Sequence, residues 1–91
     1  MTNVRQTSID AYRKLNIGNQ ERHILLTMAE QWQFPDWTLK ELSRATGLEI
    51  NAISGRVNSL KNKPPRYLIE RPTRRCSITQ RTVTPVSLRV M

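Results

Sequence analysis

Asparagine residues recur at helical spacing between residues 49 and 62. Asn51, Gly55, Asn58 and Asn62 fall on one side of the helix that this spacing predicts. An asparagine amide carries one acceptor and two donors, which can pair with a base edge in the major groove of DNA, most naturally that of adenine. Gly55 would let the helix backbone approach a ligand closely, at a cost of about 1 kcal/mol relative to alanine. The alternative is a solvated helix surface with a glycine of no special role.

Four further polar residues within 49–62 complete the candidate DNA-binding site of the predicted helix: Ser54, Arg56, Ser59 and Lys61. The two serine hydroxyls can donate to a phosphate or a base, although ordinary solvation explains the same spacing. We expect Arg56 to contact a phosphate or to pair with an acid such as Glu49 or Glu41. The lysine at the helix end, like Lys63 beyond it, also fits a favourable interaction with the negative end of the helix dipole.

Arginine is the dominant charged residue after residue 65. Residues 66–91 contain six arginines, one acid and no lysine. The planar guanidinium group suits phosphates and narrow grooves. Arg74 and Arg75 stand between two segments with strand character, so we expect them at the tip of a protruding loop, within reach of a minor groove. A solvated basic face is the alternative interpretation.

The segment from Thr38 to Leu60 predicts two short helices joined by a glycine turn. Thr38 and Glu41 have the spacing of a capping box, in which each residue satisfies a backbone donor of the other. Gly47 follows where a chain leaving a helix needs a positive φ. The residues expected to face the core are Leu39, Leu42 and Ala45 on the first helix, and Ile53, Val57 and Leu60 on the second.

Two helices are expected upstream of this pair. Thr7 or Ser8 can cap a helix that continues to about Asn16. Asn19 is expected to cap the next helix, from Gln20 to about Gln31. The buried residues of this second helix would be Ile24, Leu25 and Met28.

Three aromatic residues crowd the connection that follows, namely Trp32, Phe34 and Trp37. An aromatic group of this kind is more typical of the edge of a small core than of a base-stacking surface. If the group were exposed instead, it would form an apolar patch for a partner protein.

Strands are expected after the prolines at 64 and 65, which end helical structure. Residues 67–70 have strand character, residues 72–80 are rich in turn-forming and basic residues, and residues 82–90 alternate with period two. Pro85 cannot donate to a ladder, so the last strand is either an edge strand or broken there. We therefore predict a mainly α fold with a small β-ribbon, as a single domain over 7–91 behind a flexible tail at 1–6.

Composition narrows the classes of function. The 91 residues carry a net charge of +8 and a pI near 10.9, which favours a polyanionic partner. Cys76 and His23 are the lone residues of their types, and no metal-ligand spacing, phosphate-binding loop or catalytic pair accompanies them. We expect no enzyme, no cofactor and no metal. The single cysteine and the lack of an apolar leader or spanning segment favour an intracellular protein without a membrane partner.

The order of these elements resembles the winged helix-turn-helix fold, in particular the MarR-like and small bacteriophage-encoded DNA-binding proteins. The resemblance covers about residues 7–90 and is most specific at ELSRATGLEINAISGRVNSLKN and at LIERPTRRCSITQRT. It implies three helices plus a two- or three-stranded wing, with residues 49–61 as the recognition helix. It also implies that Arg74, Arg75 and Arg81 are wing residues near the sugar-phosphate backbone or minor groove.

We therefore expect a sequence-specific double-stranded DNA-binding protein, a small bacterial or phage transcription regulator acting in the nucleoid or in the cytoplasm of an infected host cell. The alternative is a winged-helix protein-interaction module, for example a phage protein that binds a host factor. RNA binding is a third class, against which the clustering of the aromatic residues at one turn argues. A monomer or weak homodimer is expected, because no clear dimerisation helix is present unless residues 7–16 supply it.

Overall fold

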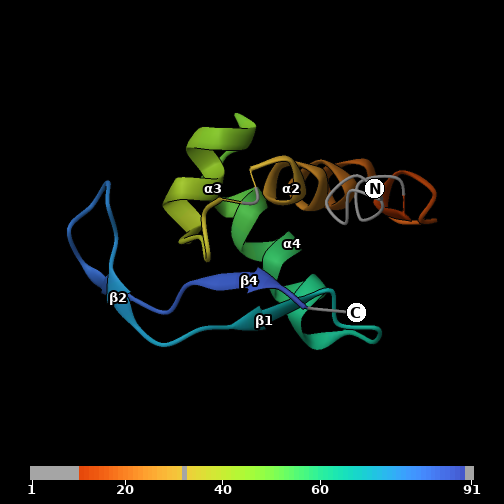
Figure 1. Cartoon of the computed structure of the whole chain (residues 1–91). Coiled ribbons are helices and arrows are strands. Elements are labelled where there is room, and N and C mark those ends of the chain that lie inside the picture. The colour runs from red at the N-terminus through yellow and green to blue at the C-terminus, as the bar shows by residue number, and fades with distance from the viewer. Residues whose placement is uncertain (1–10, 32, 90–91) are drawn as a thin grey trace.

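Helices and a long antiparallel hairpin follow one another along the chain (Figure 1). The computed structural model describes residues 11–31 and 33–89. A helical turn at residues 11–13 is followed by α2 (Asn19–Glu30), α3 (Leu39–Thr46) and α4 (Ile50–Asn62). The hairpin contains β1 (Leu68–Glu70), β2 (Arg74–Arg75), β3 (Thr82–Val83) and β4 (Val86–Leu88). The domain is thus mixed α/β, and the predicted start of the first helix at Thr7 or Ser8 lies outside the described residues.

The predicted capping box of α3 is confirmed. The Glu41 amide donates to Thr38 Oγ1 at 3.2 Å, and the Thr38 amide donates to Glu41 Oε1 at 3.0 Å. The helix ends at Gly47, whose φ of 80° lies in the left-handed region as expected. Three residues then separate the two helices, and Glu49 is the N-cap residue of α4. Local sequence signals therefore mark where α3 begins and where it ends.

The predicted cap of α2 was wrong by one residue. Gly18 is the N-cap and uses no side chain, while Asn19 is the first helical residue. The Asn19 carboxamide instead accepts a bond from Arg22 Nη1 at 3.4 Å. The other terminal nitrogen of Arg22 donates to the Leu15 carbonyl at 2.6 Å. The loop before α2 is thereby held by a side chain one turn inside the helix.

One apolar core joins the helices to the hairpin. Its buried residues are Tyr12, Ile24, Leu25, Met28, Ala29, Trp37, Leu42, Ile53, Val57, Leu60, Leu68 and Val86. The predicted stripes of α2 and α4 are confirmed, whereas Ala45 was wrongly placed and is exposed. Trp37 is buried as an edge of the core, but Phe34 stays 49% exposed. Trp32 lies outside the described residues.

The hairpin is interrupted, and its register shifts by one residue between the two short sheets, because three residues separate β1 from β2 but two separate β3 from β4. β1 pairs with β4, with Ile69 opposite Ser87, and β2 pairs with β3, with Arg74 opposite Val83. The Arg71 amide donates to the Pro85 carbonyl at 2.8 Å and links the two short sheets. The last strand is therefore broken at Pro85, one of the two predicted outcomes.

A single residue of the aromatic connection extends the β1–β4 sheet. The Trp37 amide donates to the Val86 carbonyl, and the Val86 amide donates to the Trp37 carbonyl, both at 2.8 Å. β4 consequently lies between Trp37 and β1. This bridge ties the residue just before α3 to the hairpin.

Candidate nucleic-acid interface

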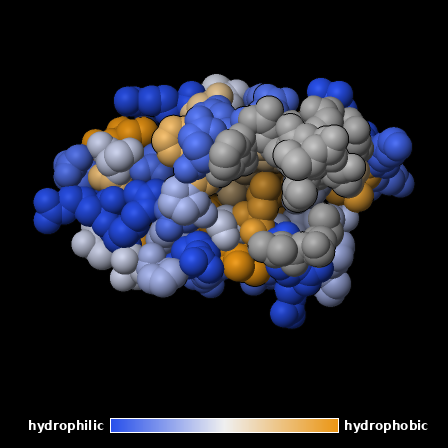
Figure 2. Space-filling view, viewed as in Figure 1, coloured by the Kyte–Doolittle hydropathy of each residue, from blue (hydrophilic) through white to orange (hydrophobic). Residues whose placement is uncertain are grey.

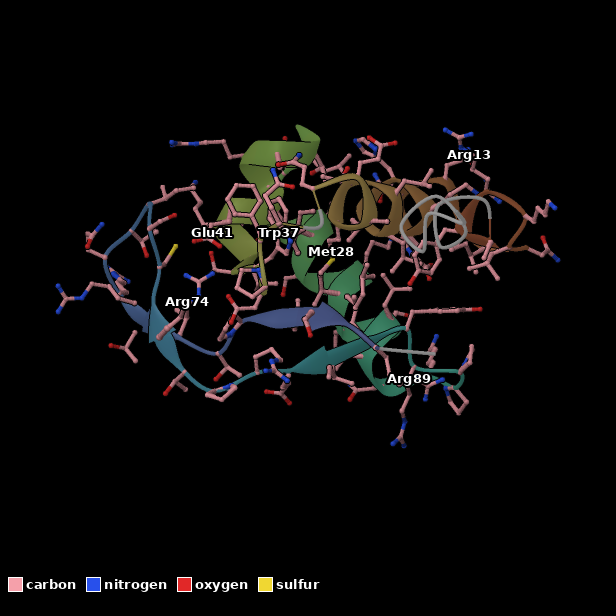
Figure 3. The ribbon with its side chains drawn as sticks, in the orientation of Figure 1. Arg13, Met28, Trp37, Glu41, Arg74 and Arg89 are labelled. Atoms are coloured by element: carbon pink, nitrogen blue, oxygen red, sulfur yellow. The ribbon has the colours of Figure 1, made fainter. Side chains whose placement is uncertain are left out.

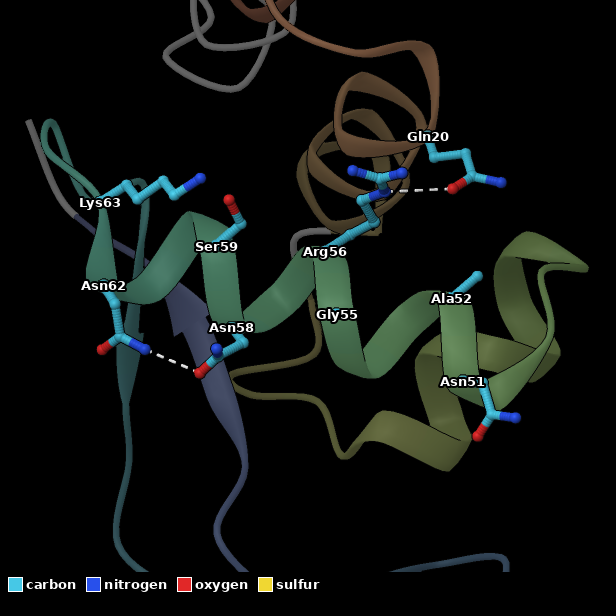
Figure 4. A pocket seen from close by; sticks show the side chains of 9 residues that line it. All are labelled: Gln20, Asn51, Ala52, Gly55, Arg56, Asn58, Ser59, Asn62 and Lys63. Carbon is cyan, nitrogen blue, oxygen red and sulfur yellow. Dashed lines mark hydrogen bonds between the residues drawn. The ribbon is translucent and has the colours of Figure 1, made fainter.

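The polar face of α4 is exposed, as the helical spacing predicts. Ile53, Val57 and Leu60 are buried, while the outer face of α4, which we define as Asn51, Gly55, Asn58 and Asn62, is exposed. Figure 4 shows these residues along one side of the helix. They line a shallow hollow of about 530 Å³ that also includes Gln20 from α2. The structure therefore brings the predicted residues of this helix onto one accessible surface.

Two asparagines of this face are already paired with each other. Asn62 Nδ2 donates to Asn58 Oδ1 at 2.7 Å (Figure 4). This bond restricts the rotamer of Asn58 and leaves its amide donors, together with the Asn62 oxygen, available to a ligand. Asn51 makes no side-chain hydrogen bond within the described part of the chain. The face thus presents one pre-oriented amide pair and one adaptable amide two turns away.

Gly55 has no packing requirement inside the molecule. A Cβ atom built on it would have no non-local atom within 4 Å, and its backbone conformation is helical. Alanine would fit without strain and would favour the helix. The interior of the fold therefore does not require glycine at this position.

Arg56 pairs with an acid that the sequence did not suggest. Its Nη1 lies 3.8 Å from Glu21 Oε1, and its Nε donates to Gln20 Oε1 at 3.2 Å. The predicted partners Glu49 and Glu41 were wrong, because the start of α2 packs beside the middle of α4. The Arg56 side chain is 51% exposed while that of Glu21 is 20% exposed, so the pair contributes little to stability and a phosphate can compete for the guanidinium.

The remaining polar residues of α4 differ in exposure. Ser54 is exposed and Ser59 is half-buried at the rim of the hollow. Lys61 Nζ lies 3.7 Å from Glu70 Oε1 of β1, another exposed pair. Lys63 lines the same hollow as Asn58. No acid occurs within α4 itself, so the helix adds positive charge to its own polar face.

Neither Arg74 nor Arg75 lies at a loop tip, and that prediction was wrong, because both belong to β2. The Arg74 side chain crosses to the start of α3, near Glu41 and Trp37 (Figure 3). Its Nε donates to Asp36 Oδ1 and its Nη2 to Glu41 Oε1, each at 2.7 Å. Nη1 also donates to Glu41 Oε2 at 3.1 Å, so the contact with Glu41 is bidentate. The residue joins the hairpin to α3.

Arg74, Asp36, Glu41 and Ser77 form a cluster whose hydrogen bonds determine its electrostatics. Burial raises the pKa of Glu41, but bonds from Arg74, Thr38 and Ser77 outweigh that effect and lower the pKa to about 2. The Ser77 hydroxyl donates to Glu41 Oε2 at 2.7 Å. The bond to Glu41 raises the pKa of Arg74 above its ordinary value, against the lowering effect of burial. Glu41 therefore caps α3 and anchors the hairpin at the same time.

Cys76 supplies a second link between the hairpin and α3. Its Sγ lies 3.1 Å from Thr38 Oγ1, and the residue is 1% exposed. Burial raises the pKa of the thiol, but hydrogen bonds from Thr38 and from the backbone of Thr79 and Ile78 lower it to about 7. Its burial is that of a small apolar residue in the hairpin. The bond to Thr38 was not predictable, because the two residues are far apart in the sequence.

Arg75 and Arg81 are the exposed arginines of the outer hairpin. Arg75 lies opposite Thr82 in the β2–β3 pair, and Arg81 accepts the Cys76 amide at its carbonyl, at 2.8 Å. Neither forms an ion pair within residues 11–31 and 33–89. The tight turn between them ends at Gln80, whose φ is 64°. In Figure 2, hydrophilic side chains cover much of the hairpin end of the molecule, on the left, next to a small apolar group.

The described part of the chain shows no metal-binding cluster and no membrane-spanning helix. His23 is exposed, and its Nε2 lies 2.9 Å from the Thr46 carbonyl. Among the described residues, no three His, Cys, Asp or Glu side chains gather in a way that could hold a metal ion. The helices that the structure describes include none with the length and apolar character needed to cross a membrane. Comparison of the chain with protein-family models, curated proteins and solved structures gave no match.

Proposed function

We propose that this chain is a sequence-specific double-stranded DNA-binding protein with a winged helix-turn-helix fold. The order of elements supports the fold: helix α2, a one-residue strand at Trp37, helices α3 and α4, and then the hairpin. The sheet order supports it as well, because β4 pairs with Trp37 on one side and with β1 on the other. In this assignment α4 is the recognition helix and the outer hairpin is the wing.

The outer face of α4 is the observation that carries the proposal. A major groove is about 12 Å wide and admits one helix, whose side chains then meet base edges. This face offers amides rather than long charged chains, and the Asn58–Asn62 hydrogen bond fixes one amide pair in advance. The bare backbone at Gly55, midway along the helix, allows close approach to the groove. Such a face suits base reading better than solvation alone.

The exposed arginines of the hairpin would supply much of the binding strength. Arg75 and Arg81 carry no internal counter-ion in the described structure, so their charge is available to phosphates or to a minor groove. Arg74 takes a different role from the one expected, because its donors are used by Asp36 and Glu41. We infer that it holds the wing in place and does not contact DNA. The biological action would be that of a small bacterial or phage regulator occupying an operator.

The experiment that tests this proposal is selection from a randomised duplex library, followed by amide chemical-shift mapping of the labelled full chain with the selected duplex. We expect a defined motif to emerge, with the largest shifts in α4 and at the hairpin tip. Recovery of no motif, or shifts confined to surfaces away from α4, would contradict the proposal. A competing duplex RNA of the same sequence separates DNA recognition from general polyanion binding.

A further inference from the structure

An apolar pocket of about 610 Å³ lies between α3 and the tip of the hairpin, away from the outer face of α4. Its apolar walls come from three separate parts of the chain: Phe34, Pro35 and Trp37 from the aromatic connection, Ala45 from α3, and Ile78 from the hairpin turn. We call it the Phe34 pocket. It shares no lining residue with the hollow on α4. Its size is within the range of pockets that bind an organic group.

Aromatic geometry keeps this pocket open. Phe34 packs edge-on against Trp37, with ring centroids 5.3 Å apart and an interplanar angle of 70°. Trp37 is buried and fixed by its backbone bridge to β4, so Phe34 rests on a rigid support. Phe34 nevertheless remains half exposed, the more exposed of the two large apolar residues on the described surface. A half-exposed aromatic ring at the edge of a mainly apolar pocket offers a contact surface to an apolar side chain.

The polar wall of the pocket also has a fixed geometry. Asp36 and Glu41 line it, but both carboxylates are already bound by Arg74. Arg74 offsets one of the two negative charges, and Glu41 also accepts hydrogen bonds from Thr38 and Ser77. The same bonds hold the hairpin, with Ile78, at its distance from α3. The pocket is therefore prevented from collapsing by a network that does not itself need a ligand.

The pocket rim also carries a positive charge that has no ion-pair partner among the described residues. Arg44 lines the pocket, is exposed, and forms no ion pair in the part of the chain that the structure describes. An occupant that places an anionic group beside an apolar one would match this rim. A second copy of the chain is a poor match, because each copy carries a net charge of +8.

We propose that the Phe34 pocket binds a peptide segment of an acidic partner protein. One large aromatic or aliphatic side chain of the segment enters between Phe34 and Ile78, and a neighbouring carboxylate contacts Arg44. The pocket shares no lining residue with the hollow on α4, and because Ser77 and Ile78 lie in the hairpin turn between Arg75 and Arg81, peptide binding is measured without DNA. A chain that binds both ligands at once would link a partner protein to its DNA site.

The test uses the full labelled chain and a blocked pentapeptide, acetyl-Asp-Glu-Phe-Glu-Asp-amide, in an amide chemical-shift titration. We expect saturable shifts centred on Phe34, Trp37, Arg44 and Ile78. Ala45→Trp fills the pocket from an exposed helical position and should weaken binding about tenfold or more. Its matched control is Ala11→Trp, an exposed helical alanine that lies outside the pocket and should bind as the parent does.

The charge contribution has its own comparison. Arg44→Gln should weaken binding about three- to fivefold, in line with an exposed ion pair, while Arg13→Gln leaves it unchanged. Replacing the peptide phenylalanine by alanine should abolish the shifts, and replacing its acids by lysines should weaken them strongly. Equal binding of the alanine peptide or the lysine peptide would overturn the proposal. Unchanged peptide affinity in Ala45→Trp would also overturn the proposal. Both of these outcomes concern the peptide alone and do not depend on whether the chain binds DNA.

Discussion

The Arg74 guanidinium and the Glu41 carboxylate meet at 2.7 Å across the gap between the hairpin and the first turn of α3. Glu41 also completes the capping box of that helix, so a single side chain couples helix initiation to hairpin placement. The two residues are 33 positions apart in the sequence. Long-range charge pairing of this kind determines where the outer hairpin sits.

Removing the arginine should destabilise the fold. In Arg74→Gln, Asp36 and Glu41 lose their charged partner while still largely buried, with side chains 17% and 14% exposed. We expect a loss of about 1–3 kcal/mol in the free energy of unfolding, measured by urea denaturation. The control Arg75→Gln, on the exposed side of the same strand, should change stability by less than about 0.5 kcal/mol. Equal effects of the two substitutions would show that the ion-pair network has no structural role.

The same network predicts a pH dependence of stability. The pKa of Glu41 is about 2 in the folded chain, against an ordinary value of 4.5. A lowered folded pKa contributes stability that is complete above pH 4.5 and is lost as the pH falls towards 2. Urea unfolding of Glu41→Gln at several pH values should therefore show a flatter acid limb than that of the parent chain. Parallel acid limbs in the two proteins would contradict this assignment.

Gly47, which ends α3, and Gly55, within α4, should respond in opposite ways to substitution by alanine. Gly47→Ala places a side chain at a φ of 80° and should cost about 1 kcal/mol. Gly55→Ala meets no atom within 4 Å and should stabilise α4 by about 0.5–1 kcal/mol. If α4 enters a groove closely, Gly55→Ala will also weaken DNA binding despite the gain in stability. A stabilised variant with unchanged DNA affinity would remove the role that we give to Gly55.

Salt dependence tests the role of the exposed arginines. If six to eight phosphates are neutralised, the logarithm of the binding constant should fall against the logarithm of salt with a slope of about −5 to −7. Arg75→Gln and Arg81→Gln should each make this slope shallower by about 1 and weaken all duplexes equally. A slope near zero for the parent chain would rule out the electrostatic contribution.

Sequence reasoning succeeded where short-range signals determine structure. The capping box at Thr38, the turn at Gly47 and the apolar stripe of α4 depend on neighbours within about one or two turns of helix. It failed where the partner lies far along the chain. The partners of Arg74 are Asp36 and Glu41, which lie 38 and 33 residues away in the sequence. The partner of Arg56 is Glu21 on α2, so no local pattern indicates either pairing.

The candidate site was likewise predictable where it depends on helical periodicity and not where it depends on distant contacts. The exposure of Asn51, Gly55, Asn58 and Asn62 followed directly from helical periodicity. The sequence left the aromatic connection open between a core edge and an exposed patch, and the far wall of the Phe34 pocket, at Ile78, depends on a hairpin turn that Arg74 holds near α3. An aromatic cluster in sequence does not reveal which of its rings will be buried, and here Trp37 is buried while Phe34 is not.

The central claim is that the outer face of α4 reads base sequence, and the ratio of affinities for a selected duplex and a random duplex measures it directly. Asn51→Ala with Asn58→Ala should bring this ratio close to one, each lost pair costing about 1–3 kcal/mol, while affinity for random DNA stays nearly constant. The control pair Asn16→Ala with Gln33→Ala alters exposed amides elsewhere and should retain the ratio. A fully folded Asn51/Asn58 variant with the parent ratio would contradict the account.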